Sequence, residues 1–116
     1  MDQKLSLSTH ILDVNLGKPA QDVAIKLFKF VDNLWVESAC QAHTDTNGRF
    51  KDFKKVDDSV AGTYKIRFET KEYFDRLGIN DTLYPYIEII FEIKSLDHYH
   101  VPLLLSAFGY SSYRGS

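Results

Sequence analysis

The sequence is poor in cysteine and proline and has no long apolar run, and these absences exclude several classes of protein. Its one cysteine, Cys40, cannot form an intrachain disulfide, which favours a reducing compartment. No apolar stretch approaches the roughly 20 residues that a membrane-spanning helix needs. Residues 1–6 lack the apolar core of a signal peptide. We therefore expect a cytoplasmic protein, or a peroxisomal one if the source is eukaryotic, with Cys40 as a buried, unreactive thiol.

The sequence also has no marked excess of charge of either sign. Fourteen Lys and Arg residues against sixteen Asp and Glu residues give a net charge of −2. This balance provides no electrostatic footprint for nucleic acid or for an anionic membrane surface, so we expect neither partner. With 116 residues and no repeat or linker, the chain is predicted to form a single domain, 1–116, around one core.

Most of the chain has the period of two that is typical of β-strands. Between Thr63 and Glu69, apolar and charged residues alternate strictly, and the pattern recurs around residue 90. Segments rich in Asp, Asn, Gly and Pro separate these runs, as turns do. The predicted strands are Leu5 to Asp13, Val23 to Phe30, Leu34 to Ala42, Thr63 to Glu69, Tyr86 to Lys94, and a run through Val101 to Tyr110, with a hairpin across Val31 to Asn33.

One short helix is predicted after the alternating segment at 63–69. Thr70 is a candidate cap, an apolar stripe follows through Tyr73, Phe74 and Leu77, and Gly78 can end the helix in the left-handed conformation. Short strands separated by turns, with one helix, indicate a mostly all-β fold, an antiparallel sandwich.

The candidate functional residues follow from the faces of two strands. In the first strand the odd-numbered residues from Leu5 to Ile11 are apolar or Thr and form the core face, so the even-numbered ones point outward. The same holds for the strand near residue 100. The outward sets are Ser6, Ser8 and His10 on the first strand, and His98, His100 and Pro102 on the second.

Several interpretations of these residues are open. Outward histidines are commonly solvated surface residues, and His43 has no supporting context. The spacing of His98 and His100 would let two imidazoles share a metal ion, but the sequence offers no obvious Asp, Glu or Cys partner for them at short range. Arg49 follows the Asn47-Gly48 turn, where a flanking charge is ordinary. Taken alone, these patterns predict a β-sandwich with histidines on an outer face.

The C-terminal segment Tyr113-Arg114-Gly115-Ser116 follows directly on the last apolar run. It offers a guanidinium, a flexible glycine, a hydroxyl and a carboxylate. It is either an ordinary polar tail, as most termini are, or a segment that reaches into a site.

Four segments, in order and covering nearly the whole chain, resemble the transthyretin-like family, and specifically its enzyme branch, the 5-hydroxyisourate hydrolases. The terminal tetrapeptide is the most specific of these features. Ala107 and Asp22 depart from the family pattern, at positions where Pro and Gly are common, and both lie in connections between strands. The segments are Leu7 to Asp13 with Gly17 to Ala20, Thr44 to Arg49, Tyr84 to Ile89, and His98 to Ser106 continuing into Phe108 to Ser116.

The resemblance implies a sandwich of two four-stranded sheets with one short helix, assembled as a homotetramer, a dimer of dimers with active sites between the dimers. It implies that His10, Arg49, His100 and the segment Tyr113, Arg114, Gly115 and Ser116 line that site. The implied reaction is hydrolysis of 5-hydroxyisourate, a purine-derived small molecule. A histidine suits the deprotonation of water, and an arginine suits the charge on the attacked carbonyl.

The implied roles are water activation and proton transfer for His10 and His100, and substrate positioning and charge stabilisation for Arg49 and Arg114. Which histidine is the base stays open, and the scheme needs no metal and no organic cofactor. Two other functions remain as alternatives: a carrier of an aromatic hormone that resembles transthyretin, and a generic interaction module. Residues 10, 49, 100 and 113–116 discriminate between these, because the vertebrate carrier lacks them.

Overall fold

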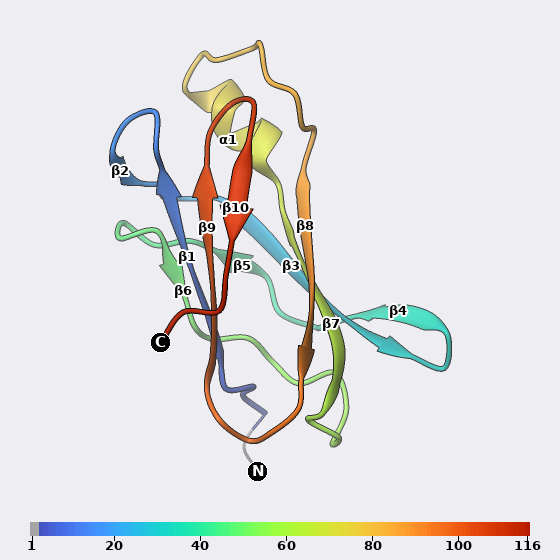
Figure 1. The fold of residues 1–116 in the computed structure, drawn as a ribbon. Coiled ribbons are helices and arrows are strands. Elements are labelled where there is room, and N and C mark those ends of the chain that lie inside the picture. The colour runs from blue at the N-terminus through green and yellow to red at the C-terminus, as the bar shows by residue number, and fades with distance from the viewer. Residues whose placement is uncertain (1–2) are drawn as a thin grey trace.

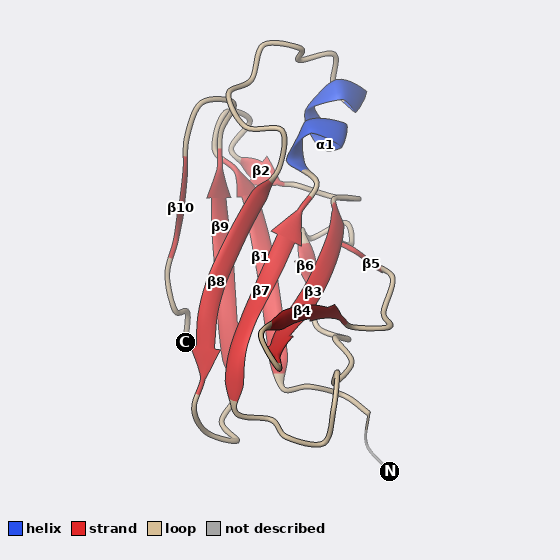
Figure 2. Ribbon diagram, turned by 90° about the vertical axis from the view of Figure 1, so that its right-hand side faces the viewer, coloured by secondary structure: helices blue, strands red, loops and turns tan. Residues whose placement is uncertain are grey.

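The computed structural model describes residues 3–116 as two β-sheets packed face to face, with one helix at one end (Figures 1 and 2). Met1 and Asp2, part of the segment in which we find no signal peptide, lie outside the described residues. The elements are β1 (Leu7–Asp13), β2 (Lys18–Pro19), β3 (Ala24–Val31), β4 (Leu34–Glu37), β5 (Ala42–His43), β6 (Arg49–Phe50), β7 (Gly62–Phe68), α1 (Thr70–Arg76), β8 (Ile87–Ile93), β9 (Tyr99–Leu105) and β10 (Tyr110–Ser112).

The first sheet has the order β10-β9-β1-β2, and the short strand β6 also pairs with β1. All pairs are antiparallel except β1 with β9, which run parallel from Leu7 opposite Tyr99 to Asp13 opposite Leu105. The antiparallel expectation therefore fails for this one pair. A tight hairpin forces neighbouring strands to be antiparallel, but most of the chain separates β1 from β9, so no such constraint acts.

The second sheet has the order β4-β3-β7-β8, and β5 also pairs with β3. Each sheet is thus a path of four strands, as expected, plus one short strand. The single strand predicted from Leu34 to Ala42 is wrong, because Glu37 lies opposite Phe28 and Ala42 lies opposite Ile25. The chain has two more residues here than β3 has to match them, so it bulges away from the sheet.

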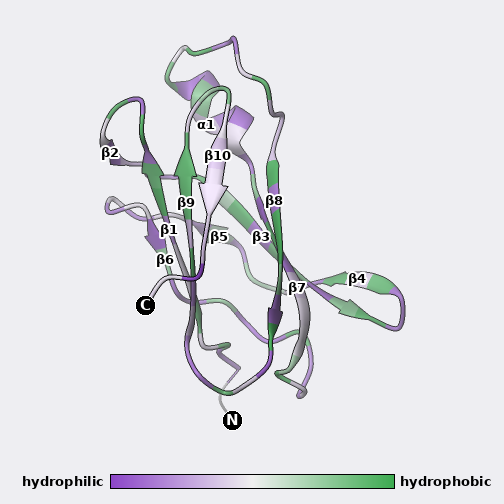
Figure 3. Ribbon diagram, viewed as in Figure 1, coloured by the Kyte–Doolittle hydropathy of each residue, from purple (hydrophilic) through white to green (hydrophobic). Residues whose placement is uncertain are grey.

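The core lies between the sheets and follows the predicted alternation. In β1 the odd-numbered residues are buried, and in β7 Tyr64, Ile66 and Phe68 are buried while their neighbours are not. Cys40 is buried, as predicted. The short strand β2 is hydrophilic, whereas much of β9 is hydrophobic (Figure 3). No helix among residues 3–116 is long and apolar enough to cross a membrane.

The predicted helix forms. Its C-terminal end agrees with the prediction, whereas its N-terminal cap does not. Gly78 has a φ of +76° and ends it, as predicted. Thr70 does not cap it: Glu69 holds the cap position without a side-chain bond, and the Thr70 hydroxyl is buried without a partner. The side chain of Thr70 is used in the core, where it cannot reach the free amides of the first turn. Leu77 is 44% exposed, so only Tyr73 and Phe74 form the buried stripe.

Two connections between strands can be compared with the sequence predictions. The hairpin predicted across Val31 to Asn33 is confirmed. It turns at Asp32 and Asn33, whose φ values of 50° and 65° are those of a two-residue type I′ turn. The last apolar run is not one strand. It ends at Leu105, turns at Ser106, whose amide donates to the carbonyl of Gly109, and returns as β10.

Candidate active site

The outward face of the first sheet brings the predicted residues together because β1 lies between β6 and β9. In the register, His10 lies opposite Arg49 of β6 on one side and opposite Pro102 of β9 on the other. One step earlier along the same face, Ser8 lies opposite His100. The outward side chains of three strands therefore converge around His10, which the sequence alone could place only on a face.

The C-terminal segment continues the register of β10 along β9. Gly115 forms a bridge with His100, and its amide donates to the His100 carbonyl oxygen at 2.8 Å. A Cβ at position 115 would collide with Cδ2 of the His100 ring and lie 3.4 Å from Cγ of Pro102. The glycine therefore allows the backbone to lie flat against the imidazole. Pro102 points outward, as predicted. It is buried because the C-terminal segment covers it.

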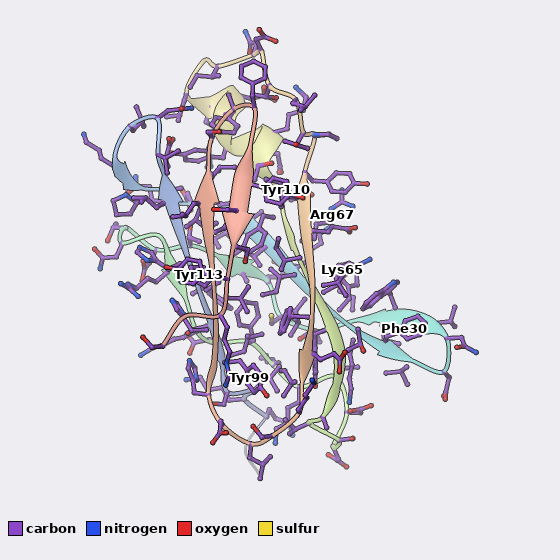
Figure 4. All side chains as sticks on the ribbon, in the orientation of Figure 1. Phe30, Lys65, Arg67, Tyr99, Tyr110 and Tyr113 are labelled. Atoms are coloured by element: carbon purple, nitrogen blue, oxygen red, sulfur yellow. The ribbon has the colours of Figure 1, made fainter. Side chains whose placement is uncertain are left out.

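Tyr113 and Arg114 lie on opposite sides of this segment. The guanidinium of Arg114 is 4.1 Å from the centre of the Tyr99 ring. Tyr99 belongs to the buried face of β9, so Arg114 points away from the face that carries His100. Tyr113 is 58% exposed (Figure 4). Within one chain, therefore, the structure brings Gly115 to His100 but does not bring Arg114 to it.

A pocket of about 570 Å³ opens on this face. Its wall includes Ser8, Arg49 and His100, and also His98. His43, expected to be a surface residue, is exposed and also lines the pocket. His10 lies next to Arg49 without forming part of the pocket wall.

Arg49 is held opposite His10 by the turn that precedes it. The Asp45 carboxylate accepts hydrogen bonds from the backbone amides of Asn47 at 2.8 Å and Arg49 at 3.0 Å, and these bonds, that from Arg49 most of all, lower the pKa of Asp45. Gly48 has a φ of +73°, and a Cβ there would lie 2.6 Å from the carbonyl oxygen of Ile11. The turn can approach β1 this closely only with glycine at 48.

The environment favours neutral imidazoles beside a free guanidinium. Burial and the nearby charge of Arg49 lower the pKa of His10 below its usual 6.5. Burial, followed by Arg49, His10 and His98, lowers the pKa of His100 below the same value. In residues 3–116, no carboxylate lies within ion-pair distance of the Arg49 guanidinium. Both histidines can therefore accept a proton near neutral pH, and Arg49 is available to bind an oxygen that gains negative charge.

His98 is engaged by serines rather than arranged for a metal ion. Its Nδ1 lies 2.8 Å from Oγ of Ser6, and its Nε2 lies 2.8 Å from Oγ of Ser8. Ser8 Oγ also lies 2.7 Å from Nδ1 of His100. The two imidazoles thus share a hydroxyl, and residues 3–116 contain no group of three His, Cys, Asp or Glu suited to a metal ion. Ser8 was recognisable as outward from sequence, but its contact with His100 depends on the parallel register.

The face that carries His10, Arg49 and His100 belongs to a sandwich of the transthyretin class. The family model described as "HIUase/Transthyretin family" matches residues 7–115, and the chain belongs to that family. This confirms the resemblance seen in the sequence.

Relatives of known name are similar over nearly the full chain. The 5-hydroxyisourate hydrolase of Salmonella typhimurium is 45% identical over 111 residues, covering 95% of this chain and 80% of that protein. The solved 5-hydroxyisourate hydrolase of Klebsiella pneumoniae is 34% identical with a TM-score of 0.77, covering 95% of this chain and 98% of that one. Sea bream transthyretin, solved in complex with thyroxine, is 29% identical with a TM-score of 0.85, covering 95% and 94%. The fold therefore does not distinguish a hydrolase from a carrier, and the two functions must be distinguished by the residues of the site.

Proposed function

We propose that this protein hydrolyses 5-hydroxyisourate to 2-oxo-4-hydroxy-4-carboxy-5-ureidoimidazoline, a step of urate degradation. One observation carries the proposal: His10, Arg49 and His100 converge on one face, with lowered histidine pKa values and an unpaired guanidinium. The names of relatives with 45% and 34% identity support it. The single cysteine is consistent with a reaction in the cytoplasm.

In the proposed reaction His100 is the base that activates water. Its Nδ1 is engaged by Ser8, which leaves Nε2 as the atom that takes the proton. Arg49 stabilises the negative charge that develops on the attacked carbonyl oxygen and orients the planar ring. His10, beside Arg49, assists proton transfer to the leaving ring nitrogen. This mechanism uses no metal and no organic cofactor.

The C-terminal segment is proposed to close the site. Gly115 holds the His100 ring in place, and Tyr113 and Ser116, both exposed, are available to contact the substrate. Arg114 would have to leave the Tyr99 ring to do the same. We therefore assign Arg114 first to anchoring the segment, and to substrate binding only if that contact opens.

We also propose that the chain assembles as a homotetramer, a dimer of dimers with the pocket facing the channel between dimers. Each sheet has an edge strand, β8 or β10, with backbone groups free to pair. Ile90 on β8 is 60% exposed and Tyr110 on β10 is 42% exposed, so both edges carry apolar surface. Sedimentation at micromolar concentration should give a tetramer, and a monomer alone would contradict this assembly.

The activity is tested by following the decay of 5-hydroxyisourate by its ultraviolet absorbance, after generating it from urate with urate oxidase. Purified protein without added metal should accelerate the decay in proportion to its concentration. A decay equal to the spontaneous rate in buffer would refute the proposal.

The carrier remains the second candidate because of the likeness to the thyroxine complex of sea bream transthyretin. A carrier would bind thyroxine in a titration and leave the decay of 5-hydroxyisourate unchanged. The hydrolase proposal predicts the reverse, since imidazoles and a guanidinium line this pocket.

A further inference from the structure

A continuous chain of hydrogen bonds leads from His100 to the surface. It runs from Nδ1 of His100 to Oγ of Ser8 at 2.7 Å, and from there to Nε2 of His98 at 2.8 Å. It ends with Nδ1 of His98 at 2.8 Å from Oγ of Ser6. His100 and Ser8 are half-buried, whereas His98 and Ser6 are exposed. The chain thus begins at the proposed base and ends in solvent.

The parallel pairing of β1 and β9 creates this chain. Ser8 lies opposite His100 in the register, and the amide of Tyr99 donates to the carbonyl of Ser6, which brings the segment before β1 alongside the start of β9. Alternation then puts the two serines and the two histidines on one face. Ser8 and His100 lie within these strands, which the core fixes on their other face, and Ser6 and His98 directly precede them.

We propose that Ser8, His98 and Ser6 form a proton wire that carries the proton taken from the attacking water out to solvent. The proposal rests on the function proposed above. It makes Ser8 and His98 positioning and relay residues that act through His100, whereas His100 itself meets the water.

The hydrogen count of these groups permits the transfer. The hydroxyl of Ser8 has one hydrogen, so it donates to one imidazole and accepts from the other. In the resting arrangement Nδ1–H of His100 donates to Ser8, and Ser8 donates to Nε2 of His98. The Nδ1–H of His98 then donates to Ser6, and Nε2 of His100 holds a free lone pair directed at water.

Each bond then shifts by one place. When water attacks, its proton goes to Nε2 of His100, and the Nδ1 proton of that ring passes to Ser8. The Ser8 hydrogen passes to Nε2 of His98, the Nδ1 proton of that ring passes to Ser6, and the Ser6 hydroxyl hydrogen leaves to solvent. His100 ends neutral with the opposite tautomer. After the product leaves, Nε2 of His100 releases its proton to water in the open pocket while Ser6 takes a proton from solvent, so every bond shifts back and the resting state is restored.

The reaction requires such an exit. Water adds to a ring carbonyl, the carbon–nitrogen bond breaks, and the second water hydrogen ends on the leaving nitrogen. The new carboxyl group is ionised near neutral pH, so one proton is released per turnover. Around His100, Arg49 is cationic, the backbone of Gly115 covers the ring edge, and His10 is assigned to the leaving nitrogen, so none of these three carries the proton to solvent. The path through Ser8 is the one built from proton carriers.

The test compares Ser8→Ala and His98→Gln with Ser8→Thr, which keeps the hydroxyl. In dilute buffer, kcat should fall roughly ten- to a hundredfold in the first two variants, less than on loss of the base itself, with KM unchanged. Added imidazole should restore kcat in both by carrying the proton from solution. The wild type and Ser8→Thr should be insensitive to imidazole. An unchanged kcat in Ser8→Ala, or a loss that imidazole does not relieve, would overturn the wire.

A second measurement needs no substrate and separates this proposal from the function. Nitrogen-15 spectra of the imidazoles report which ring nitrogen carries the proton. Ser8→Ala should change the tautomer ratio of His98 and His100 together, while His43 is unaffected. Wild-type protein that fails to hydrolyse 5-hydroxyisourate refutes the function and the wire's role with it. Active wild-type protein whose two tautomers do not respond to Ser8→Ala refutes the wire alone.

Discussion

The outer faces of the two sheets follow the same alternation but have opposite chemistry. On the β7 face, Lys65 lies 3.5 Å from Glu88, and Arg67 lies 2.7 Å from Glu69 and stacks over Tyr86. Lys65 and Arg67 lie on the side of the sandwich away from β1 (Figure 4). Both of these cations have an anion and an aromatic ring as partners within the chain.

On the β1 face, by contrast, polar groups have hydrogen-bond donors and acceptors that remain free to bind a ligand. Arg49 has no anion within reach among residues 3–116, and the imidazoles bond to serine hydroxyls. Paired charges stabilise their own sheet and have little left to offer a ligand. An unpaired guanidinium beside neutral imidazoles can bind a developing oxyanion and accept a proton. The comparison shows that the partners of a side chain, more than its exposure, distinguish the functional face.

The largest effect should come from removing the unpaired groups. His100→Ala, His10→Ala and Arg49→Ala should each lower the rate of 5-hydroxyisourate decay roughly a hundred- to ten-thousandfold. Their stability should change by about 1 kcal/mol or less, because these side chains lie outside the core. Arg67→Gln on the other face is the matched control and should keep full activity. Equal losses on both faces would abolish the distinction.

A smaller effect is expected from adding one methyl group beside the base. In Gly115→Ala the new Cβ collides with the His100 ring, so the ring or the C-terminal segment must move and kcat should fall. Gly109→Ala is the control, because a Cβ there meets Ser106 Oγ at an ordinary 3.7 Å. Steady-state kinetics on both variants, with circular dichroism to confirm folding, would make this comparison. Normal kcat in Gly115→Ala would show that the contact is dispensable.

The charge of Arg49 should be visible in the titration of both histidines. Their pKa values are lowered below 6.5, so activity should be constant above that pH and fall as the pH drops through the lowered values. The folded state then binds fewer protons than the unfolded state, so stability also declines below pH 6.5 and not above it. In Arg49→Gln, imidazole proton signals should report higher pKa values for both. No upward shift would mean that the guanidinium does not act on them.

The smallest effect is expected on the paired face. Lys65→Met removes one ion pair with Glu88, and such pairs contribute about 1 kcal/mol or less, decreasing with salt. Denaturant unfolding of this variant at low and high salt should differ little from wild type, with unchanged activity. A loss of several kcal/mol would show that this face also carries a tightly coupled network.

The sequence predicted which face each of these residues occupies, because alternation within one strand is a local property. It placed His10 and His100 outward, and the resemblance to a family added Arg49 and the C-terminal segment. It did not predict that Ser8 would touch His100, since that contact depends on the parallel register of strands about 90 residues apart. Such registers are set when the two sheets close on the core.

Local patterns failed where tertiary contacts compete with them. Thr is a residue type that commonly caps helices, but the side chain of Thr70 is buried in the core. The run from Leu34 to Ala42 does not form one strand, because it has two more residues than the stretch of β3 that pairs with it. Arg114 was expected to bind the substrate, and this stays a prediction; within one chain, alternation along the C-terminal segment places its guanidinium over the Tyr99 ring. The sequence alone could not predict the side on which Arg114 lies, because alternation assigns a side only once the register of the segment on β9 is known.

The most direct test of the difference between the faces is to see where a substrate-like ring binds. Urate lacks the hydroxyl of the substrate and is not its hydrolytic target, so it can be titrated into the protein and followed by amide proton–nitrogen correlation spectra. The account predicts shifts concentrated at Ser8, His10, Arg49 and His100, with the amides of Lys65 and Arg67 unmoved. Shifts confined to the β7 face, or none at saturating urate, would contradict it.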